Sequence, residues 1–105
     1  MTKTIKVNSL ELPHDDRYQL TKIKAKANMF NMIGKGDSST GSLHSNPIIV
    51  GNRCDVWRSV SSGISTSPVT SIELTDDPAK VLIHTESESV YELINLDMVD
   101  VVKKV

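Results

Sequence analysis

The stretches Lys80-Val-Leu-Ile-His-Thr85 and Ser89-Val-Tyr-Glu-Leu-Ile94 decide the fold class of this chain. Both are rich in β-branched and aromatic residues, which favour strands, and the short polar segment between them is typical of a hairpin turn. Both faces of the expected hairpin are largely apolar. We therefore predict a hairpin that other parts of the chain cover.

The turn of this hairpin sets which side chains share a face. A two-residue turn at Ser87 and Glu88 places His84 opposite Tyr91 on one face of the hairpin. Ser-Glu is a poor sequence for such a turn, so a longer loop or a bulge is the alternative.

Further strands are expected on the N-terminal side of the hairpin. Val69-Thr-Ser-Ile-Glu-Leu74 is followed by the turn sequence Asp76-Asp-Pro78, and this predicts a three-stranded meander over residues 69–94. Residues 47–50 and 53–60 are predicted strands as well. In the second of these, alternation puts Cys54, Val56 and Val60 on one face and Asp55, Trp57 and Ser59 on the other.

Thr21-Lys-Ile-Lys-Ala-Lys-Ala27 alternates with a period of two, which favours a strand over a helix. A strand would gather Lys22, Lys24 and Lys26 on one face, where they could contact the phosphates of a single-stranded nucleic acid. The alternative is an edge strand that uses lysines to prevent unwanted pairing.

The middle of the chain has the composition of loops. All five glycines lie between residues 34 and 63, and we expect a flexible Gly/Ser-rich loop at about 34–46 and a second loop at 61–68. At the C-terminus, the spacing of Met98, Val101, Val102 and Val105 predicts a short helix with Asp97 as its N-cap, and a final strand is the alternative.

The chain of 105 residues is expected to form a single domain, 1–105, of the mainly β class. The architecture we predict is a small twisted antiparallel sheet, a sandwich or a partly open barrel, with the C-terminal meander and a short terminal helix. The sequence has no apolar run long enough to span a membrane, no signal peptide pattern and one cysteine, so a cytoplasmic location without membrane association is expected.

The formal net charge of −1 hides an asymmetry. Residues 1–35 carry seven basic and three acidic side chains, whereas residues 71–105 carry eight acidic and three basic ones. Oppositely charged ends are expected to complement each other within the fold or across a dimer, and a basic face for an anionic partner is the alternative.

Motifs that would indicate catalysis are weak. His14-Asp-Asp16, together with His44 and His84, could supply a two-histidine, one-carboxylate metal site, but Pro13-His-Asp-Asp is also typical of a surface turn. The segment Gly34–Gly41 has neither P-loop nor dinucleotide-binding spacing. We predict a protein that is not an enzyme and has no cofactor and no metal, with a small metal-dependent enzyme as the remote alternative.

The function we predict is a small non-enzymatic protein-interaction or regulatory accessory module. It would act through an exposed β surface or as a homodimer, with a protein partner or a second copy bound at Trp57, His84 and Tyr91. The alternative is a nucleic-acid-binding module that uses Lys22, Lys24 and Lys26.

Overall fold

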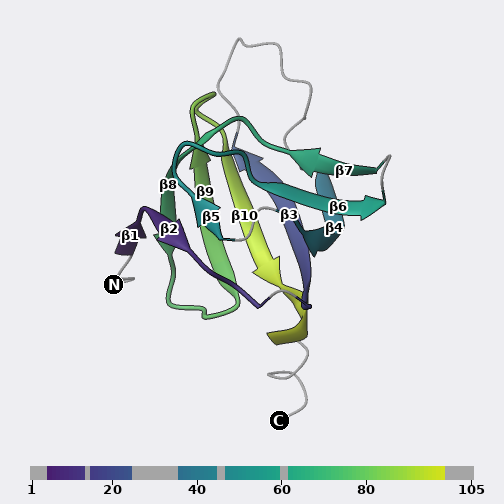
Figure 1. Cartoon of the computed structure of the whole chain (residues 1–105). Coiled ribbons are helices and arrows are strands. Elements are labelled where there is room, and N and C mark those ends of the chain that lie inside the picture. The colour runs from purple at the N-terminus through teal and green to yellow at the C-terminus, as the bar shows by residue number, and fades with distance from the viewer. Residues whose placement is uncertain (1–4, 14, 25–35, 45–46, 60–61, 99–105) are drawn as a thin grey trace.

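Ten β-strands make up most of the chain that the computed structural model describes, which comprises residues 5–13, 15–24, 36–44, 47–59 and 62–98. In chain order they are β1 (Ile5–Val7), β2 (Ser9–Leu10), β3 (Arg17–Lys24), β4 (Ser38–Leu43), β5 (Ile48–Ile49), β6 (Asp55–Ser59), β7 (Ser62–Ser65), β8 (Val69–Leu74), β9 (Lys80–Thr85) and β10 (Val90–Asn95). Eight of them form one antiparallel sheet in the order β1-β8-β9-β10-β3-β4-β6-β7, and β2 pairs with β5 (Figure 1). The predicted mainly β class is confirmed, and the sheet is not closed into a barrel.

The predicted meander is present, because β8, β9 and β10 are consecutive in the chain and adjacent in the sheet. In β9 and in β10, every second side chain is buried and the others are half-buried. This strict alternation follows from the pleat of a strand, which turns successive side chains to opposite faces. We call the face that carries the buried side chains the inner face and the opposite one the outer face.

The core lies on the inner face and is mostly aliphatic. Its largest fully buried members are Tyr18, Leu20, Ile48, Ile72, Ile83, Leu93, Val56 and Val69. Ile48 comes from β5, and Figure 1 shows β2 and β5 in front of the β8–β10 strands. The β2–β5 pair therefore covers the inner face, and β6 and β7 turn across the other end of the sheet (Figure 1).

Two segments predicted as loops contain strands, which is a correction. Ser38–Leu43 is β4, which pairs with β3 and β6, and Ser62–Ser65 is β7, which pairs with β6. Sheet hydrogen bonds come from the backbone, so serines and glycines can occupy a strand whose neighbours are in place. The inward residues of β4 are Ser39 and Leu43, which do not produce a recognisable apolar pattern.

The chain enters a helical turn at residues 96–98, directly after β10. Its cap is Asn95, whose Oδ1 accepts hydrogen bonds from the backbone N–H of Asp97 (3.0 Å) and of Met98 (3.1 Å). The prediction that Asp97 is the N-cap is wrong, since its Oδ2 instead accepts a bond from the backbone N–H of Arg17 (2.8 Å). The rest of the predicted helix lies outside the described residues.

Candidate functional site

His84 and Tyr91 lie on opposite faces of the sheet, so the prediction that they share a face is wrong. Val90 pairs with His84, and Tyr91 pairs with Ile83. When the pairing of two strands shifts by one residue, two residues that were expected to lie opposite each other point to different faces of the sheet. Tyr91 is buried at 2% exposure, while His84 is half-buried on the outer face.

The loop between β9 and β10 explains this register. The backbone N–H of Thr85 donates to the carbonyl of Ser89 (3.1 Å), and Glu88 has a φ of 62°. A hairpin loop that ends in a left-handed residue is a common longer alternative to a two-residue turn. The hydroxyl of Ser87 lies 3.1 Å from that of Thr85 and 2.9 Å from that of Ser67, and these contacts hold the loop against the neighbouring strand connection.

The lysines of β3 do not form the expected exposed row. Lys22 is buried at 2% exposure on the inner face, together with Tyr18 and Leu20, whereas Lys24 is exposed. Tyr18 and Leu20 share the parity of Lys22, and their burial in the core turns Lys22 inward as well. The strand is not an edge strand either, since it lies between β10 and β4.

A bulge then separates Lys22 from Lys24. Tyr91 pairs with Lys22 and Val90 pairs with Lys24, so Ile23 is the extra residue on β3. A bulge interrupts the alternation of a strand, and both Ile23 and Lys24 are exposed here. Lys26 lies outside the described residues, and a role of these lysines in binding nucleic acid stays a prediction.

Buried ionisable groups cluster beside Lys22. Its Nζ lies 6.0 Å from the centroid of the Tyr91 ring, at the outer limit of a cation–π contact. Burial lowers the pKa of Lys22, and the nearby Asp37 opposes this shift. Burial raises the pKa of Tyr91 and raises that of the Cys54 thiol to about 12, so Cys54 is a protonated core residue and not a thiolate nucleophile at neutral pH.

The outer face of β8, β9, β10 and β3 carries apolar and charged side chains side by side. His84 Nε2 lies 3.1 Å from Glu73 Oε1, and Lys80 Nζ lies 3.4 Å from Glu92 Oε2. Apolar side chains lie on the same face; they are Leu82, Val90, Ile94 and Ile23. Ile23 is 38% exposed, although β3 is a central strand.

Trp57 lies away from His84 and Tyr91 in the sheet order, on β6, where it is half-buried. It pairs with Ser42 of β4 and with Gly63 of β7, and a Cβ added to Gly63 would lie 2.6 Å from the Trp57 ring. The indole therefore packs directly on the backbone of Gly63, as aromatic residues do beside glycines in sheets. The predicted inward parity of Cys54 and Val56 on this segment is confirmed.

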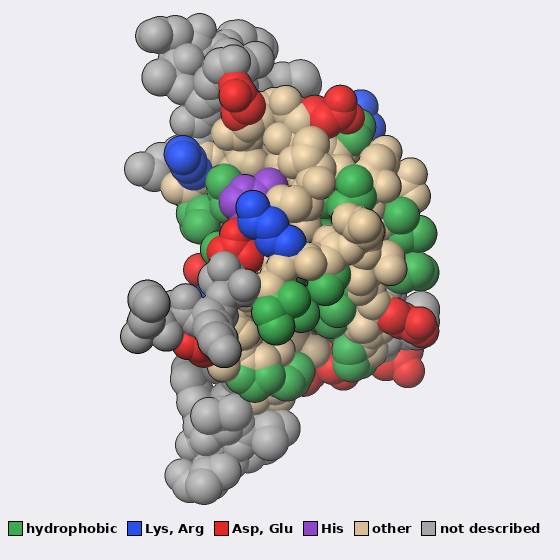
Figure 2. Space-filling model, turned by 90° about the vertical axis from the view of Figure 1, so that its left-hand side faces the viewer, with side chains coloured by type: hydrophobic (Ala, Val, Ile, Leu, Met, Phe, Trp, Pro, Cys, Tyr) green, Lys and Arg blue, Asp and Glu red, His purple; other side chains and the backbone are tan. Residues whose placement is uncertain are grey.

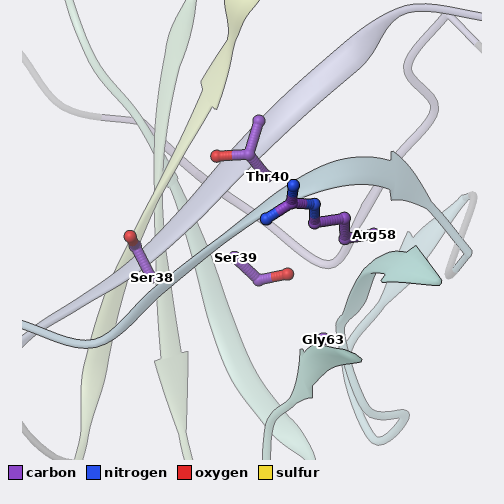
Figure 3. A pocket seen from close by; sticks show the side chains of 5 residues that line it. All are labelled: Ser38, Ser39, Thr40, Arg58 and Gly63. Carbon is purple, nitrogen blue, oxygen red and sulfur yellow. The ribbon is translucent and has the colours of Figure 1, made fainter. Parts of the chain in front are cut away.

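A polar groove opens where β6 leaves β4. The two strands pair only at Ser42–Trp57 and Leu43–Val56, and a bulge follows between Trp57 and Ser59. The groove has a volume of about 550 Å³, and its described lining residues are Ser38, Ser39, Thr40, Arg58 and Gly63. Figure 3 shows the guanidinium group of Arg58 extending over β4, between Thr40 and Ser39.

The sequence did not predict this groove, because the groove forms where β4 and β6, which are separated in the chain, cross each other. The one available signal was Arg58, since residues 36–70 contain only two basic side chains. Ser39 is nearly buried, and its Oγ donates to the carbonyl of Val56 (2.9 Å), which ties β4 to β6 below the groove.

The residues of the predicted metal site are not assembled in the described structure. Asp16 Oδ2 accepts a hydrogen bond from Asn95 Nδ2 (2.9 Å), His84 pairs with Glu73, and His14 lies outside the described residues. In residues 5–13, 15–24, 36–44, 47–59 and 62–98, no three His, Cys, Asp or Glu side chains converge in a way that could hold a metal ion.

In the part of the chain that the structure describes, no helix is long and apolar enough to cross a membrane. Figure 2 shows one side of the molecule, where hydrophobic side chains form several clusters separated by polar and charged atoms. Searches against protein-family models, curated proteins and solved structures found no match to this chain.

Proposed function

We propose that the chain is a non-enzymatic interaction module and that a second copy of the chain binds to the outer face of its sheet. The observation that carries this proposal is Ile23, a large apolar residue that is 38% exposed near the end of β3, a central strand of the sheet. None of the outer positions of β9 and β10 is buried, so Leu82 and Ile94 also retain apolar surface on the outer face. Exposed apolar surface of this kind on a sheet is typical of an interaction site.

The charges of this face favour a second copy as the partner. Glu73 and Glu92 lie on it together with Lys80 and His84, so both signs are present within one surface. A two-fold interface brings one surface against itself, which requires that surface to be self-complementary. The formal net charge of −1 also leaves little repulsion between copies.

The experiment is a measurement of molar mass by sedimentation across a range of about 10 to 500 µM. The wild-type chain is expected to shift from monomer towards dimer as its concentration rises, and Ile23→Lys is expected to remain monomeric. Ile49→Lys is the matched control, because Ile49 is 40% exposed but lies on β5, which covers the inner face. A wild-type chain that is monomeric throughout, or equal effects of the two substitutions, would contradict the proposal.

A further inference from the structure

The two edges of the eight-stranded sheet differ in how they are protected. β1, at one edge, carries the exposed Lys6, and a lysine is a common device against unwanted pairing at an edge. β7, at the other edge, has the sequence Ser62-Gly-Ile-Ser65, with neither a charge nor a proline. Within the described part of the chain, β7 pairs only with β6. The β7 edge therefore lacks the usual barrier to a further strand.

The hydrogen bonds next to the β6–β7 hairpin identify which backbone groups of β7 face this edge. The backbone N–H of Thr66 donates to the carbonyl of Cys54 (3.0 Å), so these two residues form a hydrogen-bonded pair. Such pairs alternate along an antiparallel ladder, so Ile64 points its backbone groups at β6, and those of Gly63 and Ser65 point away from it. Neither Gly63 nor Ser65 makes a hydrogen bond outside the sheet within the residues that the structure describes. Both therefore offer an N–H donor and a carbonyl acceptor to an added strand.

Trp57 lies beside the same edge. It pairs with Gly63, and a Cβ added to Gly63 would lie 2.6 Å from the Trp57 ring, so the indole extends over the glycine. Gly63 is exposed and Trp57 is half-buried. Side chains that lie opposite one another in a sheet point to the same face. A large apolar side chain placed opposite Gly63 on an added strand would therefore share the face of the indole and cover it, with only a glycine between them.

The charges around this edge favour an acidic partner. Arg53, which precedes β6, and Arg58, which lies on it, are both exposed. Arg53 Nη1 donates to the carbonyl of Thr66 (3.0 Å), the residue directly after β7, so its guanidinium group lies at the end of this strand. Asp55 is half-buried and pairs with Ser65. An acidic residue of a partner is therefore expected beyond Ser65, where it can reach Arg53 and avoids Asp55.

We infer that β7 binds an extended peptide segment of another protein as a further antiparallel strand. A large apolar residue of the segment lies opposite Gly63 and covers the Trp57 ring. Thr66 follows Gly63 by three residues and the segment runs in the opposite direction, so the acidic residue that meets Arg53 comes about three or four positions before the apolar one. In this mode of binding the backbone bonds supply affinity, and the two side chains supply specificity.

A second copy of the chain fits this edge less well than such a peptide. If two β7 strands paired across a two-fold axis, Gly63 would lie opposite Gly63 or Ser65 of the copy, because these are the residues whose backbone groups face the edge. Neither residue supplies an apolar side chain to the Trp57 ring. The partner that satisfies both the ring and the arginine is therefore a different chain.

The test is a titration of the full-length chain, followed by ¹H–¹⁵N NMR, with the blocked peptide Thr-Asp-Asp-Val-Thr-Phe-Thr-Val at up to about 2 mM. Its phenylalanine is designed to lie opposite Gly63, with the two aspartates on the side of Arg53. Signals of β7 and of the Trp57 indole are expected to shift. Hydrogen exchange of the Gly63 and Ser65 amides is expected to slow by at least about fivefold as the site fills.

Two N-methylated peptides test the backbone pairing itself. A methyl group on the phenylalanine nitrogen removes a hydrogen bond to Gly63 and prevents close approach, so binding should weaken by about tenfold or more. A methyl group on the nitrogen of the threonine directly before it points away from β7 and should leave binding within about twofold. Replacement of the phenylalanine by serine removes the contact with the Trp57 ring and should weaken binding by about fivefold.

Three variants of the chain locate the site. Ser65→Pro removes an N–H that faces the edge, a change that edge strands tolerate, and it should abolish binding at about 2 mM. Arg53→Gln should weaken binding by about threefold. Lys6→Gln removes one exposed positive charge from β1, at the opposite edge of the sheet, and should leave binding within about twofold of wild type.

Equal binding of the two N-methylated peptides, equal losses in Arg53→Gln and Lys6→Gln, or no shifts in β7 would each overturn the inference. Exchange of the Gly63 and Ser65 amides that slows with chain concentration in the absence of peptide would also overturn it, because a second copy would then occupy the edge. The proposed dimer uses the outer face around Ile23, so a monomeric chain would contradict the dimer without affecting this titration. The two ideas can therefore fail separately.

Discussion

The meander β8–β9–β10 and the strands β4, β6 and β7 belong to one sheet but are stabilised by different means. In the meander, aliphatic side chains such as Ile72, Ile83 and Leu93 fill the inner face. In the β4–β6–β7 region, glycines allow close backbone approach, and hydroxyl groups bond to backbone carbonyls, as Ser39 does. A strand can thus be specified by the side chains it buries or, as in β4, by the small residues that let another strand approach its backbone.

The substitution expected to change the free energy of unfolding most is Ile83→Ala, in the centre of the meander. Ile83 is fully buried, so truncation should lower the free energy of unfolding by about 4 kcal/mol through lost burial and a residual cavity. Chemical denaturation measures this value. Ile23→Ala, at an exposed position on the other face, is the control and should cost less than about 1 kcal/mol. If both variants lose the same stability, the inner face is not the core of the meander.

The corresponding test in the β4–β6–β7 region is Gly41→Ala, which adds a methyl group, whereas Ile83→Ala removes side-chain atoms. Gly41→Ala should lower the free energy of unfolding by about 3 kcal/mol, because the new Cβ would lie 2.7 Å from the Trp57 carbonyl carbon and 2.9 Å from Arg58 Cα. Both are backbone atoms, so relief requires movement of β6. Ser42→Ala, at the next and exposed position of β4, should change stability by less than about 0.5 kcal/mol. A tolerated Gly41→Ala would show that β6 can move away from β4, and that close backbone approach does not specify this part of the sheet.

The same difference explains how much the sequence could predict. The meander was predicted because its information is carried by successive side chains of each strand. The register of His84 and Tyr91 was not, since it depends on the left-handed Glu88 and on hydroxyl contacts with a distant residue, Ser67. Local patterns do not contain such non-local contacts.

The groove and the strands beside it were missed for a related reason. β4 and β7 acquire their structure from backbone pairing with neighbours, and the location of Arg58 depends on where β6 crosses Gly41. Lys22 lies on the face opposite to the predicted one, because the alternation of residues 21–27 alone does not show which face the strand buries. Extending it back to Tyr18 and Leu20 would have indicated an inward lysine.

β3 joins the two regions, and Tyr18 on it provides a prediction about pH. Its hydroxyl donates to the carbonyl of Pro13 (2.8 Å), and burial, with contributions from Asp16 and Asp97, raises its pKa from 10.0 to about 12. The folded chain therefore keeps this proton over a range where the unfolded chain loses it. The resulting stability is complete below pH 10 and falls as pH rises towards 12, by about 3 kcal/mol in all.

Denaturation at pH values from about 8 to 12 measures this loss, with Tyr18→Phe as the reference. Tyr91 and Cys54 also have raised pKa values, so the wild-type chain loses stability from several groups at once. The difference between wild type and Tyr18→Phe isolates Tyr18, and it should narrow above pH 10. A difference that stays constant with pH would show that Tyr18 ionises equally in both states.

The smallest expected effect concerns Lys22. It is the one charged residue of β3, the strand that joins the two regions, whose side chain is buried. Its ammonium group is desolvated beside the Tyr91 ring, and burial lowers its pKa, so the charged form is less stable in the folded chain than in the unfolded one. Lys22→Met keeps much of the side-chain length and removes the charge. The variant should be more stable than wild type by about 1 kcal/mol at pH 7, since a buried charge replaced by an apolar group of similar size is often stabilising.

The size of this effect should depend on pH. The unfavourable contribution of Lys22 is present below its folded pKa and disappears as pH rises towards the ordinary value of 10.5, so the advantage of Lys22→Met should shrink at alkaline pH. Lys24→Met, two residues along and exposed, is the control and should show neither the gain nor its pH dependence. If Lys22→Met instead destabilises the chain at pH 7, the favourable interactions of Lys22 with Tyr91 and Asp37 outweigh the cost of desolvating its ammonium group. In that case polar interactions hold β3 to the β4–β6–β7 region more strongly than the buried surface of β3 does.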